Sequence, residues 1–132
     1  MSTSVPMRLR DVSSKEYHAR REQARRGERE ALRLAVLEQA RAAIRELAPR
    51  FPAIRAAYLF GSVLQPGHFL PTSDVDVALD CDDIRVETPF WRELEENLER
   101  NVDLRPRLGV VAHAVETSGE RCYEREIRHP GE

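Results

Sequence analysis

The segment that most constrains the fold is DVDVALD at residues 74–80, in which polar and apolar residues alternate. Such alternation is typical of a β-strand with one face in a core. Because successive side chains of a strand point to opposite faces, Asp74 and Asp76 share one face. Val75 and Val77 lie on the other face, toward the core. Two carboxylates this close repel each other unless a cation neutralises them, and Mg²⁺ prefers oxygen ligands. The segment therefore predicts a half-buried strand that carries a candidate magnesium site.

The rest of the chain predicts helices and strands in alternation. The expected elements are a helix at 14–48, a strand at 53–60, a loop at 61–73, the strand at 74–80, a helix at 88–100, a strand at 101–106, a helix at 107–119 and a last strand at 121–127. Ser13 or Ser14 is the expected cap of the first helix, and Thr88 that of the second, with Pro89 in its first turn. Residues 1–13 are expected to be irregular. This order predicts an α/β (α+β) domain with a small mixed sheet of three or four strands flanked by helices.

The 132 residues suit one domain with a helical extension at its N-terminus. We expect the extension to span residues 1–49, the domain itself residues 50–126, and a tail residues 127–132. The first part of the long helix, at residues 18–30, is nearly all polar and contains Gly27. It is either a separate helix or a solvated extension of the apolar helix that follows.

The charge balance and the apolar pattern exclude several classes of protein. With 21 basic and 23 acidic residues the net charge is -2, so a dedicated nucleic-acid-binding surface is not expected. No segment approaches the roughly 20 apolar residues that cross a bilayer, and the N-terminus lacks the apolar run of a signal peptide. Cys81 and Cys122 are far apart in the sequence and form no CxxC pair. We expect a soluble, cytoplasmic protein with reduced thiols and no membrane contact.

The residues near the paired aspartates complete a candidate site. Gly61 and Ser62 directly follow the apolar strand at 53–60, where glycine lets backbone N–H groups approach a phosphate and the serine hydroxyl adds a hydrogen bond. Asp103 joins the aspartates if its own strand, at 101–106, pairs with the strand that carries them. Three carboxylates can hold two metal ions roughly 3.5–4 Å apart, the geometry used in nucleotidyl transfer. The pattern predicts a site for a nucleoside triphosphate.

These motifs resemble those of the minimal nucleotidyltransferases, a family of the polymerase-β-type nucleotidyltransferase superfamily. The family signature is an apolar strand that ends in Phe-Gly-Ser, a loop, and Asp-x-Asp; this chain has LFGS at 59–62 and SDVD at 73–76. The third carboxylate of the family lies in Val-Asp-Leu, matched at 102–104. Many members end in Gly-x-x-x-Tyr, matched at 119–123. The resemblance covers residues 50–125 and implies the polymerase-β-type fold.

The resemblance also implies an activity, a cofactor and roles for the site residues. Enzymes of this kind transfer AMP, or another nucleoside monophosphate, from a nucleoside triphosphate such as ATP to an acceptor hydroxyl, with two Mg²⁺ ions. Asp74 and Asp76 would bind both ions. Asp103 would complete one metal site and help to deprotonate the acceptor hydroxyl. Gly61 and Ser62 would hold the triphosphate.

The acceptor is expected to lie outside this short chain. Small members of the family are often antitoxins that adenylylate a tyrosine of a HEPN-domain toxin ribonuclease, so the resemblance implies a HEPN-type toxin as the partner. Two other functions stay open: a stand-alone transferase for a small molecule such as an antibiotic, and a non-catalytic module that binds a partner through the N-terminal helix. An oligomer formed through that helix stays open as well.

Overall fold

A computed structural model describes residues 7–127 of the chain. Its helices and strands, in chain order, are α1 (Met7–Leu47), β1 (Ile54–Phe60), β2 (Val75–Cys81), α2 (Glu87–Leu98), β3 (Val102–Pro106), α3 (Gly109–Ser118) and β4 (Glu120–Glu124). Short 3₁₀ helices at Ala48–Arg50, Gly61–Leu64 and Ile84–Val86 connect some of them. The predicted fold class and order of elements are confirmed.

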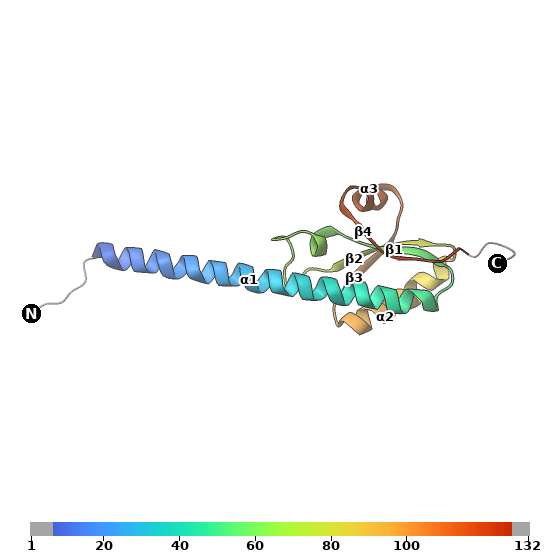
Figure 1. The fold of residues 1–132 in the computed structure, drawn as a ribbon, viewed down its shortest axis with the longest axis horizontal. Helices are drawn as coiled ribbons and strands as arrows, with labels where there is room; N and C mark the ends of the chain where they lie inside the picture. Colours follow the sequence, from blue (N-terminus) through green and yellow to red (C-terminus); the bar gives the residue numbers. More distant parts are fainter. Residues whose placement is uncertain (1–6, 128–132) are drawn as a thin grey trace, which may run out of the picture.

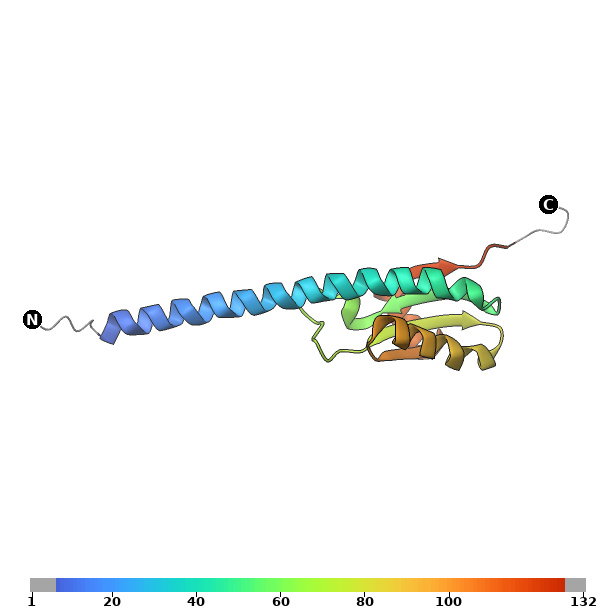
Figure 2. The same cartoon turned by 90° about the horizontal axis from the view of Figure 1, so that it is seen from below.

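The four strands form one mixed sheet in the order β3-β2-β1-β4. β1 is antiparallel to both of its neighbours, whereas β2 and β3 are parallel and are connected by α2. α1 and α2 cover one face of the sheet and α3 covers the other, as Figures 1 and 2 show from two directions. The sheet is therefore the middle layer of the domain.

The core lies between the sheet and the pair α1 and α2. From β2 it receives the fully buried Val75 and Val77, as the alternation predicts. From α1 it receives residues at helical spacing, among them Ala40, Ile44 and Leu47. The other face of β2, beneath α3, carries the polar side chains. Burial of one face therefore fixes where the aspartates of the strand point.

The helix α1 is longer than predicted and has no break. It begins at Met7, so Ser13 and Ser14 lie inside it and neither caps its start. Gly27 does not interrupt it, which makes the polar part a solvated extension of the same helix. At about 1.5 Å per residue its 41 residues span roughly 60 Å. We call residues 7–29 the arm; it projects past the sheet (Figure 1), and its described side chains, from Ser14 on, are nearly all exposed.

Smaller differences from the predicted elements concern their ends. α2 begins at Glu87, so Thr88 is inside the helix and does not cap it. Pro89 is the third helical residue, a position that proline accepts because the first turn has no partner for its backbone N–H. Residues 128–132, in the predicted tail, and residues 1–6 lie outside the described part of the chain. Among the described helices, none combines the length and the apolar character that would let it span a membrane.

Candidate active site

The turn after β1 brings a glycine against a carboxylate. Phe60, the last residue of β1, pairs with Asp76 of β2, and Gly61 follows it with a φ of +76°. A Cβ atom at Gly61 would lie 2.2 Å from Oδ2 of Asp76, which is far closer than two such atoms can approach. Glycine is therefore required twice, for the left-handed backbone and for the space that Asp76 fills. The structure confirms that the Gly61-Ser62 turn adjoins the aspartates.

The third carboxylate arrives on the neighbouring strand. β3 runs parallel to β2 in a register that pairs Asp103 with Asp76. This confirms the pairing on which the assignment of Asp103 to the site depends. Asp74 precedes β2 by one residue and is exposed. Asp76 and Asp103 are thus the second residues of two adjacent strands, and Asp74 directly precedes the first of these strands. Asp76 lies beside the turn at Gly61.

Asp76 is partly buried and lies close to two other negatively charged carboxylates. Burial, followed by the charges of Asp103 and Asp74, raises the pKa of Asp76 to about 6, while Arg105 opposes the shift. Among the described residues, Asp76 has no partner in a hydrogen bond or an ion pair. Asp76 is therefore a partly buried carboxylate whose charge no residue in the described part of the chain fully compensates.

Asp80 shows what a compensated carboxylate looks like on the same face of β2. The hydroxyl of Tyr58 donates to its Oδ2 at 3.1 Å, and Nε of Arg107 donates to its Oδ1 at 2.8 Å. The guanidinium of Arg107 also lies 5.2 Å from the centre of the Tyr58 ring. Its partners lie 22 and 27 residues away in the chain, so the sequence did not indicate this network. Asp76, in contrast, has no such partners among the described residues.

Asp103 has a protein partner in this structure. Nε of Arg105 donates to its Oδ1 at 3.1 Å, because the two residues share a face of β3. Within the part of the chain that the structure describes, no group of three or more His, Cys, Asp or Glu side chains is arranged to hold a metal ion. The donor set nevertheless suits Mg²⁺ by its chemistry: the donors are carboxylate oxygens, and their mutual repulsion at Asp76 is what a cation relieves.

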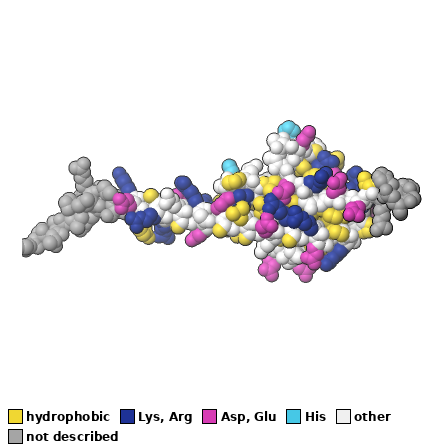
Figure 3. Space-filling model, viewed as in Figure 1, with side chains coloured by type: hydrophobic (Ala, Val, Ile, Leu, Met, Phe, Trp, Pro, Cys, Tyr) yellow, Lys and Arg dark blue, Asp and Glu magenta, His cyan; other side chains and the backbone are white. Residues whose placement is uncertain are grey.

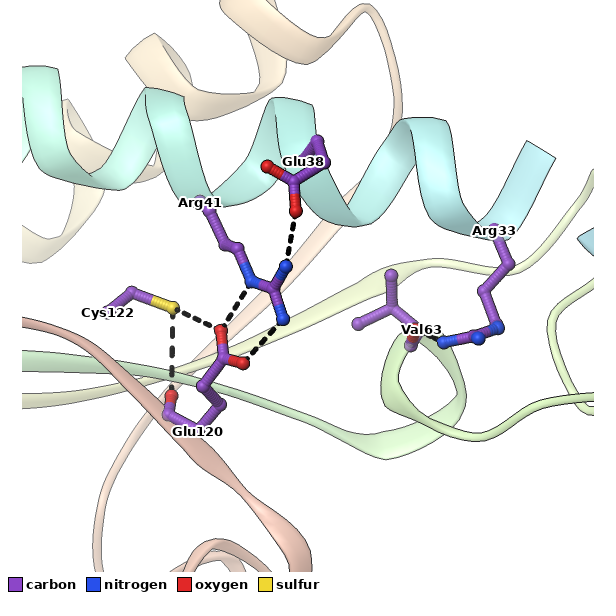
Figure 4. A network of polar contacts seen from close by, with 6 residues as sticks. All are labelled: Arg33, Glu38, Arg41, Val63, Glu120 and Cys122. Carbon is purple, nitrogen blue, oxygen red and sulfur yellow. Dashed lines mark hydrogen bonds and ion pairs between the residues drawn. The ribbon is translucent and has the colours of Figure 1, made fainter. Parts of the chain in front are cut away.

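Two arginines that the sequence did not single out anchor the segment between the turn and the aspartates. Arg33 of α1, only 6% exposed, donates through Nη1 to the carbonyl oxygen of Val63 at 3.0 Å (Figure 4). Arg100 donates to the carbonyl oxygens of Pro71 and Ser73 at 3.0 and 2.8 Å. Its guanidinium lies over the ring of Phe69. The loop between Ser62 and Asp74 is thus held at one end by Arg33, which precedes it in the chain, and at the other end by Arg100, which follows it.

A second polar network in Figure 4 holds α1 to the edge strand β4. Arg41 donates two hydrogen bonds to the carboxylate of Glu120, at 2.7 and 2.6 Å, and also contacts Glu38. The Arg41 hydrogen bonds keep the pKa of Glu120 below its usual value. Burial raises the pKa of the neighbouring Cys122 thiol to about 12. The network joins α1 to β4, which is separated from β2 by β1 in the sheet.

The fold and the site define a class. A strand, a Gly-Ser turn and a strand with paired aspartates, joined by a parallel strand with a third, form the active-site framework of a nucleotidyltransferase. The sequence profile of the family described as polymerase beta, nucleotidyltransferase, matches residues 42–127. The chain belongs to this family. The match begins inside α1, so the arm precedes it.

The chain is also similar to chains of several solved structures. A chain in the crystal structure of a toxin–antitoxin with AMP-PNP has 27% sequence identity and a TM-score of 0.55, over 65% of this chain and 74% of that chain. A chain from the tri-AMPylated Shewanella oneidensis HEPN toxin in complex with MNT antitoxin has 24% identity and a TM-score of 0.49, over 68% and 73%. A chain of the MntA–HepT toxin–antitoxin has 23% identity and the same TM-score, over 67% and 73%. No curated protein matches.

Proposed function

We propose that this protein is a metal-dependent nucleotidyltransferase that transfers AMP from ATP to a hydroxyl of a protein partner, as the antitoxin of a HEPN-type toxin. The observation that carries the proposal is Asp76, a carboxylate without a partner among the described residues, on which the charges of Asp74 and Asp103 act. Membership of the nucleotidyltransferase family supports the reaction class.

The site residues have separate roles in this proposal. Asp74 and Asp76 would hold the two Mg²⁺ ions, and Asp103 would complete one of the sites. Bound ions would supply the positive charge that neutralises the triphosphate and makes the acceptor hydroxyl easier to deprotonate. The backbone at Gly61 and the hydroxyl of Ser62 would bind phosphate oxygens of ATP.

The transfer is a substitution at the α-phosphorus of ATP. The acceptor oxygen forms a bond to this phosphorus, and the bond from the phosphorus to the oxygen that bridges to the β-phosphate breaks. Pyrophosphate leaves with the electron pair of that bond. The acceptor proton passes to Oδ2 of Asp103, the oxygen opposite the one that Arg105 contacts. Such in-line chemistry needs positioned charge more than covalent help from the protein.

A protein acceptor suits the relatives of this chain. Among the described helices, α2, α3 and the part of α1 beyond the arm pack on the sheet, so they belong to the catalytic domain itself. The relative with the TM-score of 0.55 is a toxin–antitoxin crystallised with AMP-PNP, which supports both an adenine nucleotide and a protein partner. Both cysteines are free, as suits the reducing cytoplasm that we propose as its location.

Mass spectrometry of a HEPN-domain protein incubated with this chain, ATP and Mg²⁺ tests the proposal. We expect AMP adducts on a tyrosine with the wild-type chain and none with Asp76→Asn. Pyrophosphate release with a small-molecule acceptor and no partner would favour the stand-alone transferase instead. If an Asp74→Asn, Asp76→Asn double variant still neutralised the toxin fully, the chain would be a binding module and catalysis would be dispensable.

A further inference from the structure

A hollow of about 240 Å³ lies where the first half of α2 meets the outer strand β3. β3 is the last strand on its side of the sheet, so one of its edges has no neighbouring strand. The residues that line the hollow come from these two elements: Glu87, Thr88 and Trp91 from α2, and Val102, Asp103 and Leu104 from β3. The hollow therefore adjoins Asp103, the third carboxylate of the candidate active site.

The indole of Trp91 is held next to Asp103. Its Nε1 donates to the carbonyl oxygen of Val102 at 2.7 Å, and this carbonyl group belongs to the peptide bond that joins Val102 to Asp103. The residue is nevertheless 39% exposed. Because the single N–H of the indole is already used, Trp91 offers the hollow an apolar aromatic surface.

The order of the strands places this hollow on the acceptor side of the site. Gly61 and Ser62, which would bind phosphate oxygens of ATP, follow β1, whereas Asp103 is on β3, and β2 lies between these two strands. The attacking and leaving oxygens of such a transfer lie roughly in line, on opposite sides of the phosphorus. With pyrophosphate leaving toward the turn after β1, the acceptor hydroxyl approaches from the β3 side, where the hollow lies.

The charges around the hollow do not suit a phosphate group. Of the residues that line it, Glu87 and Asp103 are acidic and none is basic. The helix α2 contains four glutamates and one arginine, and Figure 3 shows acidic side chains along the lower side of the domain, where this helix lies. Within the described part of the chain, none of these four glutamates forms an ion pair. The hollow therefore suits neither the triphosphate of ATP nor the backbone of a nucleic acid.

We propose that the hollow binds the side chain of a tyrosine of the acceptor protein, with its ring against Trp91 and its hydroxyl beside Asp103. This role of Trp91 rests on the proposed function, because it requires a protein acceptor. Aromatic rings in offset or edge-to-face contact stabilise each other beyond the area that they bury. Serine and threonine also carry hydroxyls, but they have no ring to contact the indole. Trp91 is then a residue that determines which hydroxyl the enzyme accepts.

Two substitutions of Trp91 separate the aromatic contact from the hydrogen bond. Trp91→Leu and Trp91→Phe both lose the donation to the carbonyl oxygen of Val102, but only phenylalanine keeps an aromatic ring. For AMP transfer to a purified HEPN-domain protein, we expect Trp91→Leu to lower kcat/KM by about threefold to tenfold and Trp91→Phe to lower it by less than about twofold. Equal values for the two variants would refute the inference, because a purely structural role of Trp91 would affect both alike.

Fluorine NMR provides a readout that does not depend on the rate of transfer. Trp91 is the only tryptophan of the chain, so incorporated 5-fluorotryptophan gives one signal. Without ATP, we expect this signal to shift when the HEPN-domain protein is added. The shift should be much smaller with a variant of that protein in which the adenylylated tyrosine is alanine. Equal shifts with both proteins would mean that another part of the partner covers Trp91, which would overturn the inference.

Titration with ATP and Mg²⁺, without the partner, distinguishes failure of this inference from failure of the proposed function. The wild type and both variants should bind ATP with the same affinity. Weaker binding by Trp91→Leu alone would mean that the hollow holds the base of the nucleotide, and the inference would be wrong. A wild type that binds no ATP, or that forms no adduct on the HEPN-domain protein, would refute the proposed function itself, and the inference with it.

A second copy of the chain is the other occupant to test. Tyr17, in the arm, is 57% exposed, so another copy would have a tyrosine to offer. Mass spectrometry of the chain incubated alone with ATP and Mg²⁺ should find no AMP on Tyr17. An adduct on Tyr17 of the wild type that Trp91→Leu abolishes would assign the hollow to a second copy and would overturn the inference.

Discussion

Replacing Gly61 by alanine separates the two reasons for a glycine at the active-site turn. The new Cβ would be placed 2.2 Å from Oδ2 of Asp76, and 3.1 Å from its Cγ. The carboxylate must move or the turn must shift. Gly67 offers the matched control, because its φ of +81° is as unfavourable for alanine as the +76° of Gly61, but a Cβ there would meet nothing within 4 Å.

The two alanine variants should therefore share the cost of a left-handed backbone and differ strongly in activity. An L-residue in the left-handed region costs roughly 1–2 kcal/mol, so both variants should lose about this much free energy of unfolding. Gly61→Ala should lose more than Gly67→Ala by the cost of displacing Asp76. A displacement of about 1 Å in a catalytic group can reduce a rate by about 100-fold, and we expect at least this loss for Gly61→Ala. Gly67→Ala should keep its rate within about threefold of the wild type.

Urea denaturation gives the stabilities, and the rate of AMP transfer from labelled ATP to the partner gives the activities. The comparison needs both measurements on the same preparations, below the unfolding transition of each variant. Equal activity of the two variants would refute the argument, since it would show that the contact with Asp76 does not matter. So would a Gly61→Ala chain that is destabilised as expected but still transfers AMP at the wild-type rate.

Three other changes have outcomes that follow from the structure. Asp76→Asn should stabilise the protein at pH 8 in EDTA by about 1–3 kcal/mol, while it abolishes transfer. The pKa of Asp76 in the folded protein, about 6, exceeds the unfolded value, so the gain in stability should shrink as the pH falls through 6 and vanish below about 4. Urea denaturation at several pH values measures this gain. Arg33→Ala leaves the buried carbonyl of Val63 without its donor, so it should cost about 1–3 kcal/mol and speed amide exchange in the loop that follows; unchanged exchange would contradict the anchoring role. Iodoacetamide should label Cys81 before Cys122, whose buried thiol has a pKa of about 12, and peptide mass spectrometry showing the reverse order would count against that burial.

The site was predictable from the sequence to the extent that strand geometry determines it. Alternation alone put the side chains of residues 74–80 on two faces, and the structure has the same division. The pairing of Asp103 with Asp76 was a condition in the sequence argument, and the parallel register satisfies it. Both cases involve residues within one strand or at paired positions of two strands, where the two-residue repeat of a strand determines the face on which each side chain lies.

The parts that the sequence did not predict depend on contacts between distant residues. Nothing in the sequence singles out Arg33, because the carbonyl it binds is 30 residues away. The partners of Asp80, Tyr58 and Arg107, are similarly distant in the chain. The start of α1 was misplaced because Ser13 and Ser14 suit a helix cap, while nothing in the sequence before them stops a helix short of Met7. A cap residue marks a permitted start, and the surrounding chain decides whether it is used.

The parallel register of β3 also links the position of the third carboxylate to the correct pairing of the strands. Val102 of this strand is buried, and Leu104 packs against the core. Asp103 and Arg105 alternate with them along the strand and lie on the opposite face. A shift of one residue along β2 would turn the two apolar side chains outward and Asp103 inward, which costs both the burial and the desolvation of a charge. The same alternation that supplies the third carboxylate thus destabilises a chain with its strands paired one residue out of register, so the register that buries the core is also the one that completes the site.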